Sequence, residues 1–247
     1  MKSIIDISYG KDPAHKLDIH LPEKKDFPVF VYFHGGGLEA GDKGKQVLLY
    51  EHLADCGIGV FTANYRMYPE AKYPEFVEDA AAVVAWAFEN MGKYGEVRGI
   101  YAGGSSAGGY LSMMLCFDGR WLGKHGISPM QLSGFVHDAG QPTCHFNVLR
   151  ERGIDTRRVM IDDSAPLYHV GAAEQYPPML IIVSDDDMEN RYEQTMLLMS
   201  TLRHFRYDME KIELAVMNGK HCAYVNQADD TGCSVFGKIV GDYIKRH

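Results

Sequence analysis

Short apolar segments alternate with amphipathic ones along most of the chain. The apolar segments are rich in β-branched and aromatic residues, a composition typical of strands buried on both faces. Strands are therefore predicted at 15–21, 28–33, 57–64, 98–103, 133–138, 178–184 and 211–217, the first of them alternating strictly and wet on one face. Helical periodicity predicts helices at 42–56, 73–90, 106–116, 190–205 and 234–246. In the first helix, Asp42 is expected as the N-cap and Gly57 as the C-terminal stop.

The order of these elements predicts the fold class. An antiparallel pair at the N-terminus is followed by alternating strands and helices, a pattern typical of a mostly parallel α/β sheet with helices on both faces. No repeat or linker interrupts the 247 residues, so a single domain spanning 1–247 is expected. The polar, irregular stretch 140–177 stands apart from the pattern. It is expected to be either a short lid insertion or a plain structural connection.

One glycine-rich stretch, YAGGSSAGGYLSMML at 101–115, lies where a predicted strand gives way to a predicted helix. Within it, Gly104-Ser105-Ser106-Ala107-Gly108 fits the Gly-x-Ser-x-Gly nucleophile elbow, which requires that strand–turn–helix context. Ser106 is therefore the candidate nucleophile, whereas Ser105 is expected to point away from the reacting centre. The glycine spacing fits no G-x-G-x-x-G phosphate loop.

A second glycine run follows the predicted strand 28–33, in the sequence VYFHGGG. Glycines leave backbone amides open to a substrate, so the N–H groups of Gly36 and Gly37 are candidate oxyanion donors together with that of Ala107. His34 is expected to brace this loop by hydrogen bonding rather than to act as a base.

A serine nucleophile needs a histidine base and a carboxylate that orients it, and in this type of fold the acid precedes the histidine. Three aspartates end the strand 178–184, and Asp187 is preferred because it lies at the loop exit. Asp185 and Asp186 remain alternatives. His221 is the candidate base, since it follows the last predicted strand across a short turn. Its neighbour Cys222 is expected to be a bystander.

Composition narrows the classes of partner. The formal net charge of −8 argues against nucleic acid. An odd count of five cysteines, none at CxxC spacing, favours free thiols in a reducing, cytoplasmic setting. No apolar run is long enough for a membrane helix, and residues 1–12 lack the features of a signal peptide. No metal motif is present and no cofactor is implied. The oligomeric state is left open, a homo-oligomer included.

These motifs resemble those of the α/β-hydrolase superfamily, on its side of hormone-sensitive-lipase-like enzymes and small bacterial carboxylesterases. The resemblance rests on FHGGG (33–37), NYRMYPE (64–70), GGSSAGG (103–109), IIVSDDD (181–187) and NGKHC (218–222). It implies an eight-stranded sheet, a Ser106-His221-Asp187 triad and an oxyanion hole. Two departures stand out: Ser105 replaces the family's usual aspartate, and Leu38 replaces a bulky aromatic residue, which would widen the acyl pocket. Too little chain precedes the first motif for the N-terminal cap of the lipase-like enzymes, which leaves only 140–177 to cover the site.

The resemblance implies a serine hydrolase of short-chain carboxylic esters, acetyl or similar small acyl and aryl esters, including those of carbohydrate. The substrate would be a small molecule. One alternative is an amide hydrolase on the same fold, such as an aryl formamidase or an exopeptidase. A second is a binding protein that kept the fold without the chemistry.

Overall fold

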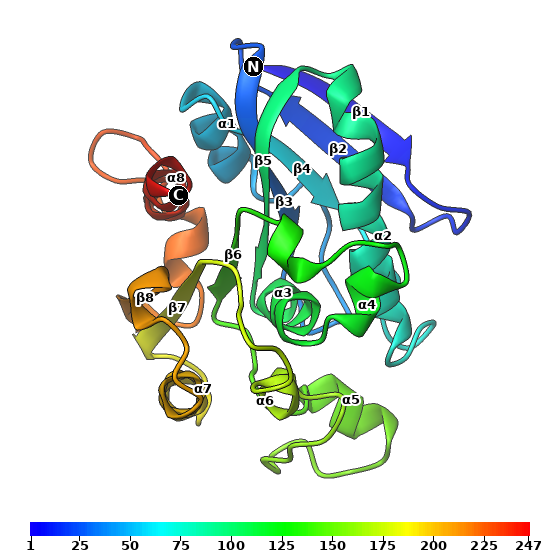
Figure 1. Ribbon diagram of the computed structural model, residues 1–247, viewed down its shortest axis with the longest axis vertical. Helices are drawn as coiled ribbons and strands as arrows, with labels where there is room; N and C mark the ends of the chain where they lie inside the picture. The colour runs from blue at the N-terminus through cyan, green and yellow to red at the C-terminus, as the bar shows by residue number, and fades with distance from the viewer.

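The computed structural model describes all 247 residues and is built on one eight-stranded sheet (Figure 1). The strands lie in the order β1-β2-β4-β3-β5-β6-β7-β8. The pairs β1–β2 and β2–β4 are antiparallel, whereas every other pair is parallel. The predicted mostly parallel sheet is thus confirmed. The bounds are β1 Lys2–Ser8, β2 Lys16–Leu21, β3 Asp26–Phe33, β4 Gly59–Ala63, β5 Glu96–Ser105, β6 Gly134–Asp138, β7 Met179–Asp186 and β8 Ile212–Lys220.

The eighth strand, β1, escaped the hydropathy pattern although the family resemblance implied it. Its pairing with β2 shifts register between Ile4 and Ile7, and Asp6 has a left-handed φ of 60°. Such a bulge breaks the two-residue alternation by which an edge strand is recognised. The antiparallel start of the sheet therefore has three strands rather than the expected pair.

Helices cover both faces of the sheet, as predicted. Helices α1 and α8 pack against each other on one face, and α2, α3 and α7 cover the other (Figure 1). Their bounds are α1 Val47–Asp55, α2 Glu75–Asn90, α3 Ala107–Phe117, α7 Arg191–His204 and α8 Val235–Arg246. Three short helices complete the fold: α4 Arg120–Gly123, α5 Phe146–Glu151 and α6 Pro166–His169.

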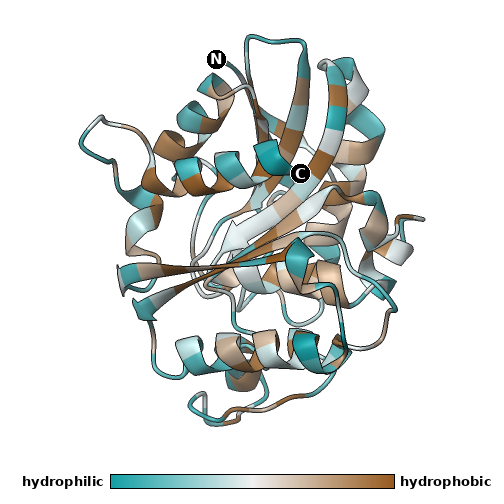
Figure 2. Ribbon diagram, turned by 60° about the vertical axis from the view of Figure 1, so that its left-hand side comes forward, coloured by the Kyte–Doolittle hydropathy of each residue, from teal (hydrophilic) through white to brown (hydrophobic).

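Strand β3 shows why the central strands are continuously apolar. Val31 and Phe33 join the core beneath α2 and α3, while the alternate residues Phe30 and Tyr32 join the core beneath α1 and α8. Because both faces are covered, no position of the strand needs to be polar. Figure 2 shows the consequence, with brown strands at the centre and teal on the outer turns of the helices.

The start of α1 differs from the prediction. The helix begins at Val47 rather than near Asp42, and no side chain caps it. The Asp42 carboxylate instead accepts hydrogen bonds from the Gly44 N–H and from the Asn64 side chain. Asp42 therefore closes a loop turn, whereas Gly57, with a φ of +82°, ends the helix as expected.

The 140–177 segment carries α5 and α6 joined by irregular backbone. It contacts the glycine run that follows β3: the Asn147 side chain donates to the Gly37 carbonyl (2.9 Å), and Arg150 pairs with Glu39. The segment is therefore fastened beside the predicted oxyanion loop. Its role as a lid stays a prediction.

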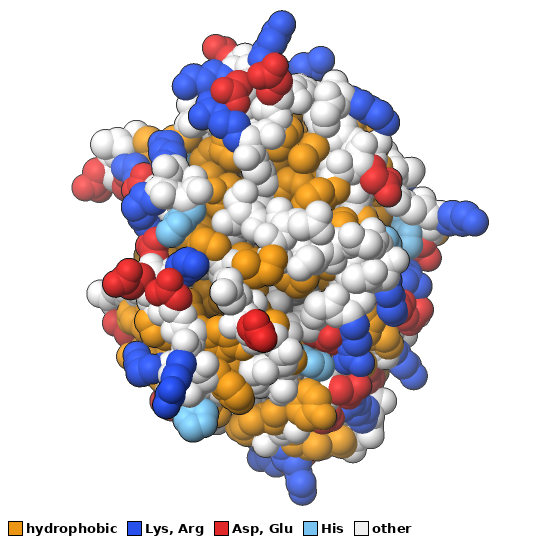
Figure 3. Space-filling view, in the orientation of Figure 1, with side chains coloured by type: hydrophobic (Ala, Val, Ile, Leu, Met, Phe, Trp, Pro, Cys, Tyr) orange, Lys and Arg blue, Asp and Glu red, His pale blue; other side chains and the backbone are white.

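The surface and the helices bear on the partner predictions. On the face seen in Figure 3, acidic and basic side chains are interspersed rather than gathered into one basic field. None of the helices combines the length and the apolar character that crossing a bilayer requires.

Candidate active site

The elbow is a sharp turn between β5 and α3. Ser106 sits between the last residue of the strand and the first of the helix, with φ 57° and ψ −111°. Side chains rarely tolerate a positive φ, so this conformation is strained and is held by its surroundings. A Cβ at Gly104 would lie 2.4 Å from the Phe33 carbonyl oxygen, and one at Gly108 only 1.9 Å from it. The two framing glycines therefore let β3 pass close beneath the turn.

Ser106, His221 and Asp187 form a hydrogen-bonded chain. The Ser106 Oγ lies 2.8 Å from His221 Nε2, and His221 Nδ1 lies 2.5 Å from Asp187 Oδ1. A carboxylate can only accept, so Nδ1 carries the proton and Nε2 is left to accept the serine hydroxyl proton. The three residues follow the ends of β5, β7 and β8, which are parallel and therefore end at the same edge of the sheet.

The Asp187 carboxylate is fully buried and well supplied with donors. Besides His221, it accepts hydrogen bonds from the backbone N–H groups of Met188 (2.7 Å) and Ser184 (3.2 Å). Burial acts to raise the pKa of Asp187, but the hydrogen bonds from His221 and the two amides outweigh it and leave that pKa below its ordinary value. The group is therefore ionised at neutral pH.

The two alternative acids have other partners. Asp185 accepts a hydrogen bond from the Gly219 N–H (2.8 Å), and Asp186 pairs with Lys220 (2.5 Å). Strand β7 runs on to Asp186, so both belong to the strand end, and neither bonds to His221.

The glycine loop after β3 lies directly against the elbow. A Cβ at Gly35 would come within 2.9 Å of the Ser105 carbonyl oxygen and 3.2 Å of the Ser106 Cβ. The N–H groups of Gly36 and Gly37 have no acceptor within the protein. Ala107 is the first residue of α3, so its N–H belongs to the unsatisfied first turn of a helix. His34 Nδ1 lies 2.7 Å from the Gly35 carbonyl oxygen and braces the loop as expected.

Ser106, His221 and the glycine loop line one open cavity of about 470 Å³. Phe146 and Met188 contribute apolar side chains to its wall. Leu38 does not widen the cavity as expected, because it is fully buried beneath the loop and lines no part of it. Phe146 thus brings the 140–177 segment into the cavity wall, whereas its neighbour His145 is buried and lines no part of the cavity.

A buried polar network that the sequence did not reveal supports the elbow. The Tyr32 hydroxyl donates to Ser105 Oγ (3.1 Å), so Ser105 does point away from the reacting centre. The backbone carbonyl of Asp138 accepts the Ser106 N–H (2.7 Å), and its carboxyl accepts from Tyr224, three residues after His221. Burial raises the pKa of Asp138 to about 6. Asp138 thus joins the segment of the nucleophile to that of the base.

Cys222 lies closer to the site than expected. Its Sγ is 3.7 Å from His221 Nε2, which a left-handed backbone at Cys222 permits. The two neighbouring side chains therefore face each other. Burial raises the pKa of the Cys222 thiol well above its ordinary value, so it stays protonated at neutral pH and is a poor nucleophile.

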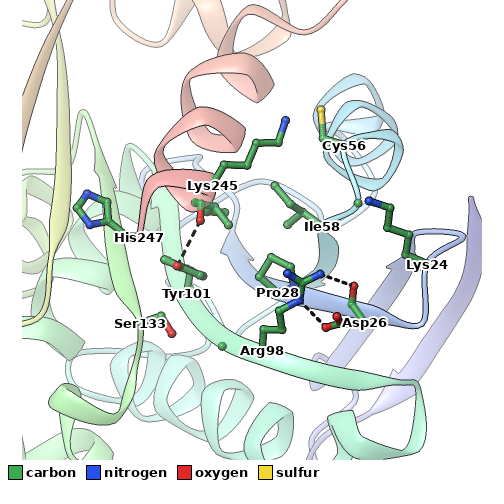
Figure 4. Close-up of a pocket in the computed structure, with 13 residues that line it drawn as sticks. Lys24, Asp26, Pro28, Cys56, Ile58, Arg98, Tyr101, Ser133, Lys245 and His247 are labelled. Atoms are coloured by element: carbon green, nitrogen blue, oxygen red, sulfur yellow. Dashed lines mark hydrogen bonds and ion pairs between the residues drawn. The ribbon is translucent and has the colours of Figure 1, made fainter.

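A cavity of about 410 Å³ on another part of the molecule holds no comparable arrangement (Figure 4). Its Arg98 pairs with Asp26, and its Tyr101 hydroxyl donates to the Ile244 carbonyl. No hydrogen bond joins its Ser133 to its His247. This cavity therefore lacks the linked serine, histidine and carboxylate that are found at the elbow.

Comparison with known proteins finds partial sequence matches and a shared fold. Residues 17–125 match the BD-FAE family model, a stretch that includes the glycine loop and the elbow but ends before Asp187 and His221. The chain is 34% identical over 109 residues to a protein of Oryza sativa subsp. japonica named probable isoprenylcysteine alpha-carbonyl methylesterase. The matched stretch is 43% of this chain and 26% of that protein. It is 28% identical over 137 residues to kynurenine formamidase of Danio rerio, 55% of this chain and 45% of that enzyme. The chain thus spans about a quarter of the first relative and less than half of the second.

The fold is shared over nearly the whole chain with solved esterase structures. Esterase B from Lactobacillus rhamnosis superimposes with a TM-score of 0.79, covering 99% of this chain and 85% of that one at 16% identity. At so low an identity the likeness establishes the fold. The eight-stranded α/β architecture and its helices are therefore those of the esterases.

Proposed function

We propose that this chain, a member of the α/β-hydrolase superfamily, is a serine hydrolase that cleaves short-chain carboxylic esters. The observation that carries the proposal is the continuous chain from Asp187 through His221 to Ser106, with contacts of 2.5 and 2.8 Å. A hydroxyl in hydrogen-bond contact with an oriented imidazole is the arrangement that acyl transfer requires.

In the first half of the reaction, Ser106 Oγ attacks the acyl carbon while His221 Nε2 takes its proton. The ionised Asp187 stabilises the imidazolium that forms and holds the ring in the tautomer that accepts at Nε2. His221 then gives the proton to the departing alcohol oxygen, and the acyl group remains on Ser106. In the second half, water attacks the acyl-enzyme with His221 again as base, and the carboxylic acid leaves.

The negative charge of each tetrahedral intermediate falls on the former carbonyl oxygen. The N–H groups of Gly36, Gly37 and Ala107 are the proposed donors to it, because the first two have no acceptor in the protein and the third opens α3. The partial positive charge of that helix N-terminus adds to the effect. Each such donor is worth about 10²–10³ in turnover in comparable enzymes.

The proposed substrates are esters of acetyl or similarly small acyl groups, including aryl esters and esters of carbohydrate. An open cavity of about 470 Å³ lined by glycine backbone and by polar side chains supports a small acyl group and a polar alcohol. The unpaired state of the five cysteines supports a reducing, cytoplasmic setting. Small-molecule esters are the only partners the proposal requires.

The test is turnover of 4-nitrophenyl esters from acetyl to octanoyl, with acetylated sugars and feruloyl esters added, together with labelling by a fluorophosphonate. Wild type should turn over the short esters and carry one label on Ser106. Ser106→Ala should lose both, with turnover reduced by about 10⁴ or more. Ser200→Ala, on the exposed side of α7, should keep both. An intact wild-type protein that neither hydrolyses the panel nor takes the label would refute the proposal.

A second candidate is amide hydrolysis, either as an aryl formamidase or as an exopeptidase. The similarity to kynurenine formamidase, which covers more of this chain than the plant match does, favours the first of these. The same three side chains would serve, with His221 protonating an amine in place of an alcohol. Comparison of kcat/KM for formyl and peptide anilides against the matching esters decides between the two functions.

A further inference from the structure

A third cavity, of about 450 Å³, adjoins the catalytic one. Phe146 and Met188 line both, so their side chains form the shared wall. The rest of its lining comes from residues 189–191 and Gln194 at the start of α7, and from Gln141 and residues 156–159 of the 140–177 segment. A substrate bound at Ser106 therefore has room to extend past these two side chains into a second compartment.

The most unusual group in this cavity is Arg191. Only 4% of its surface is exposed, yet no carboxylate lies within ion-pair distance of its guanidinium. One terminal nitrogen donates to the Ala139 carbonyl and the other lies 3.4 Å from Gln141 Oε1, while Nε has no acceptor. A buried charge is normally paired, because desolvation without a partner is costly. Burial indeed lowers the pKa of Arg191 from its ordinary value.

Other arginines of this chain show what pairing looks like. Arg66 makes a bidentate contact with Asp79, and Arg98, in the cavity of Figure 4, is matched by Asp26. Arg191 lacks such a partner although it is the most buried of the three. The folded chain therefore gives Arg191 no ion-pair partner, and the negative charge of Asp187, beyond ion-pair distance, only partly offsets the effect of burial on its pKa.

Neighbouring groups in the cavity offer further donors. Gln194, 8% exposed, accepts the Thr143 hydroxyl at Oε1, and its Nε2 has no acceptor. The side chain of Asn190 does not cap α7, and the N–H groups of Tyr192 and Glu193 have no acceptor in the protein. A helix N-terminus with free N–H groups favours negative charge.

Basic side chains outnumber acidic ones in the lining of the cavity. Arg157 and Arg158 both line the cavity. Arg157 pairs with Asp155, whereas Arg158 has no acidic partner. The only acidic residue of the lining is Glu189. In a chain of net charge −8, this excess of positive charge is local.

We propose that this cavity is an anion subsite, which binds a carboxylate on the part of the ester that lies away from the scissile bond. The proposal rests on the esterase function and names its substrate class: a small ester that also carries a carboxylate. The guanidinium of Arg191 and the amide of Gln194 hold the carboxylate from within, and Arg158 attracts it at the entrance. The carboxylate belongs either to the acyl part or to the alcohol part of the ester.

Matched pairs of esters test the proposal and distinguish the two sources. For the acyl part, the 4-nitrophenyl monoester of glutaric acid is compared with 4-nitrophenyl butanoate. For the alcohol part, 4-acetoxybenzoate is compared with its methyl ester. The measured quantity is the ratio of kcat/KM for the charged ester to that for its neutral partner, corrected by the rates of alkaline hydrolysis. The variants are Arg191→Met, Arg191→Lys and Arg158→Ala, and the control is Arg203→Ala at the far end of α7.

In at least one pair the ratio should fall about tenfold or more in Arg191→Met, mainly through KM, since charge-assisted hydrogen bonds of this kind are lost. In Arg191→Lys the ratio should lie between those of Arg191→Met and wild type. Arg158→Ala should lower the ratio less than Arg191→Met does, and Arg203→Ala should leave the ratio at its wild-type value. Arg158 is exposed, so that variant still reports if Arg191→Met fails to fold.

Equal ratios in wild type and in the Arg158 and Arg191 variants, for both pairs, would overturn the anion subsite while the neutral esters were still hydrolysed. Absence of turnover on the neutral esters would instead refute the esterase function itself. The two failures are thus separate.

Discussion

The buried carboxyl of Asp138 provides the sharpest quantitative prediction. Asp138 has no solvent exposure, accepts a hydrogen bond from Tyr224, and has no partner at Oδ2. Burial raises its pKa from 3.8 to about 6 in the folded protein. A carboxyl with a raised pKa holds its proton in the folded chain at pH values where the unfolded chain has released it. Its contribution to stability is therefore complete below the unfolded pKa and is lost as the pH rises through the folded one.

The size of the effect follows from the two pKa values. A difference of about two pH units, at about 1.4 kcal/mol for each, means that ionised Asp138 costs about 3 kcal/mol of stability at neutral pH. Asp138→Asn keeps the acceptor for Tyr224 and removes the titration. The new amide N–H₂ stands where Oδ2 has no partner, which adds a cost of about 1–3 kcal/mol that does not vary with pH.

The assay is urea unfolding of wild type and Asp138→Asn between about pH 4 and about pH 7.5. Every other titrating group is common to both proteins, so the difference between their unfolding free energies isolates Asp138. That difference should move in favour of the variant by about 2.4 kcal/mol across the range, because the unfolded carboxyl is already partly ionised at pH 4. Parallel profiles, with a constant difference at all pH values, would refute the reasoning.

Three further predictions concern the triad, the elbow and a buried ion pair. Asp187→Asn should lower kcat about 10⁴-fold because the imidazole loses its oriented tautomer. Asp185→Asn and Asp186→Asn should keep a kcat near that of wild type, since neither residue bonds to His221. Equal losses of ester turnover in all three variants would contradict the geometry. Gly108→Ala should lower the free energy of unfolding by about 3 kcal/mol, measured by thermal or urea unfolding, because its Cβ would lie 1.9 Å from the Phe33 carbonyl oxygen. Gly92→Ala should be tolerated, because no atom lies within 4 Å of its Cβ. Arg66→Met should lower the free energy of unfolding by about 3–5 kcal/mol, because Asp79, with 3% of its side chain exposed, loses its bidentate partner. Arg98→Met breaks an exposed ion pair and should lower it by about 0–1 kcal/mol. Similar urea midpoints for the two variants would contradict this difference.

The fold was predictable wherever a local pattern reports the packing. Strands buried on both faces are continuously apolar, and helices carry one apolar stripe, so most elements could be placed from hydropathy alone. Two elements departed from it. Strand β1 is bulged at Asp6, which breaks its alternation, and α1 begins at Val47 because Asp42 is held by Asn64 from a distant loop.

The residues of the candidate site also fall into those that a local pattern predicts and those that depend on distant contacts. The elbow around Ser106 and the glycine loop at 35–37 are local structures, and their glycines signal close backbone contact before any contact is known. The choice among Asp185, Asp186 and Asp187 depends on where β7 stops relative to β8, which is a matter of register between strands. The proximity of Cys222 to His221 likewise depends on a left-handed backbone that neighbouring residues impose.

Sequence by itself determined the α/β class, the sharp turn at Ser106 and the order of the chemistry along the chain, because each depends on the residues next to it. Only the tertiary structure decided which carboxylate faces the imidazole, how Asp138 joins the segments of nucleophile and base, and that Arg191 is buried without an ion-pair partner. Those features bring together side chains from strands, helices and loops far apart in the chain, and burial and charge pairing are properties of that assembled surrounding.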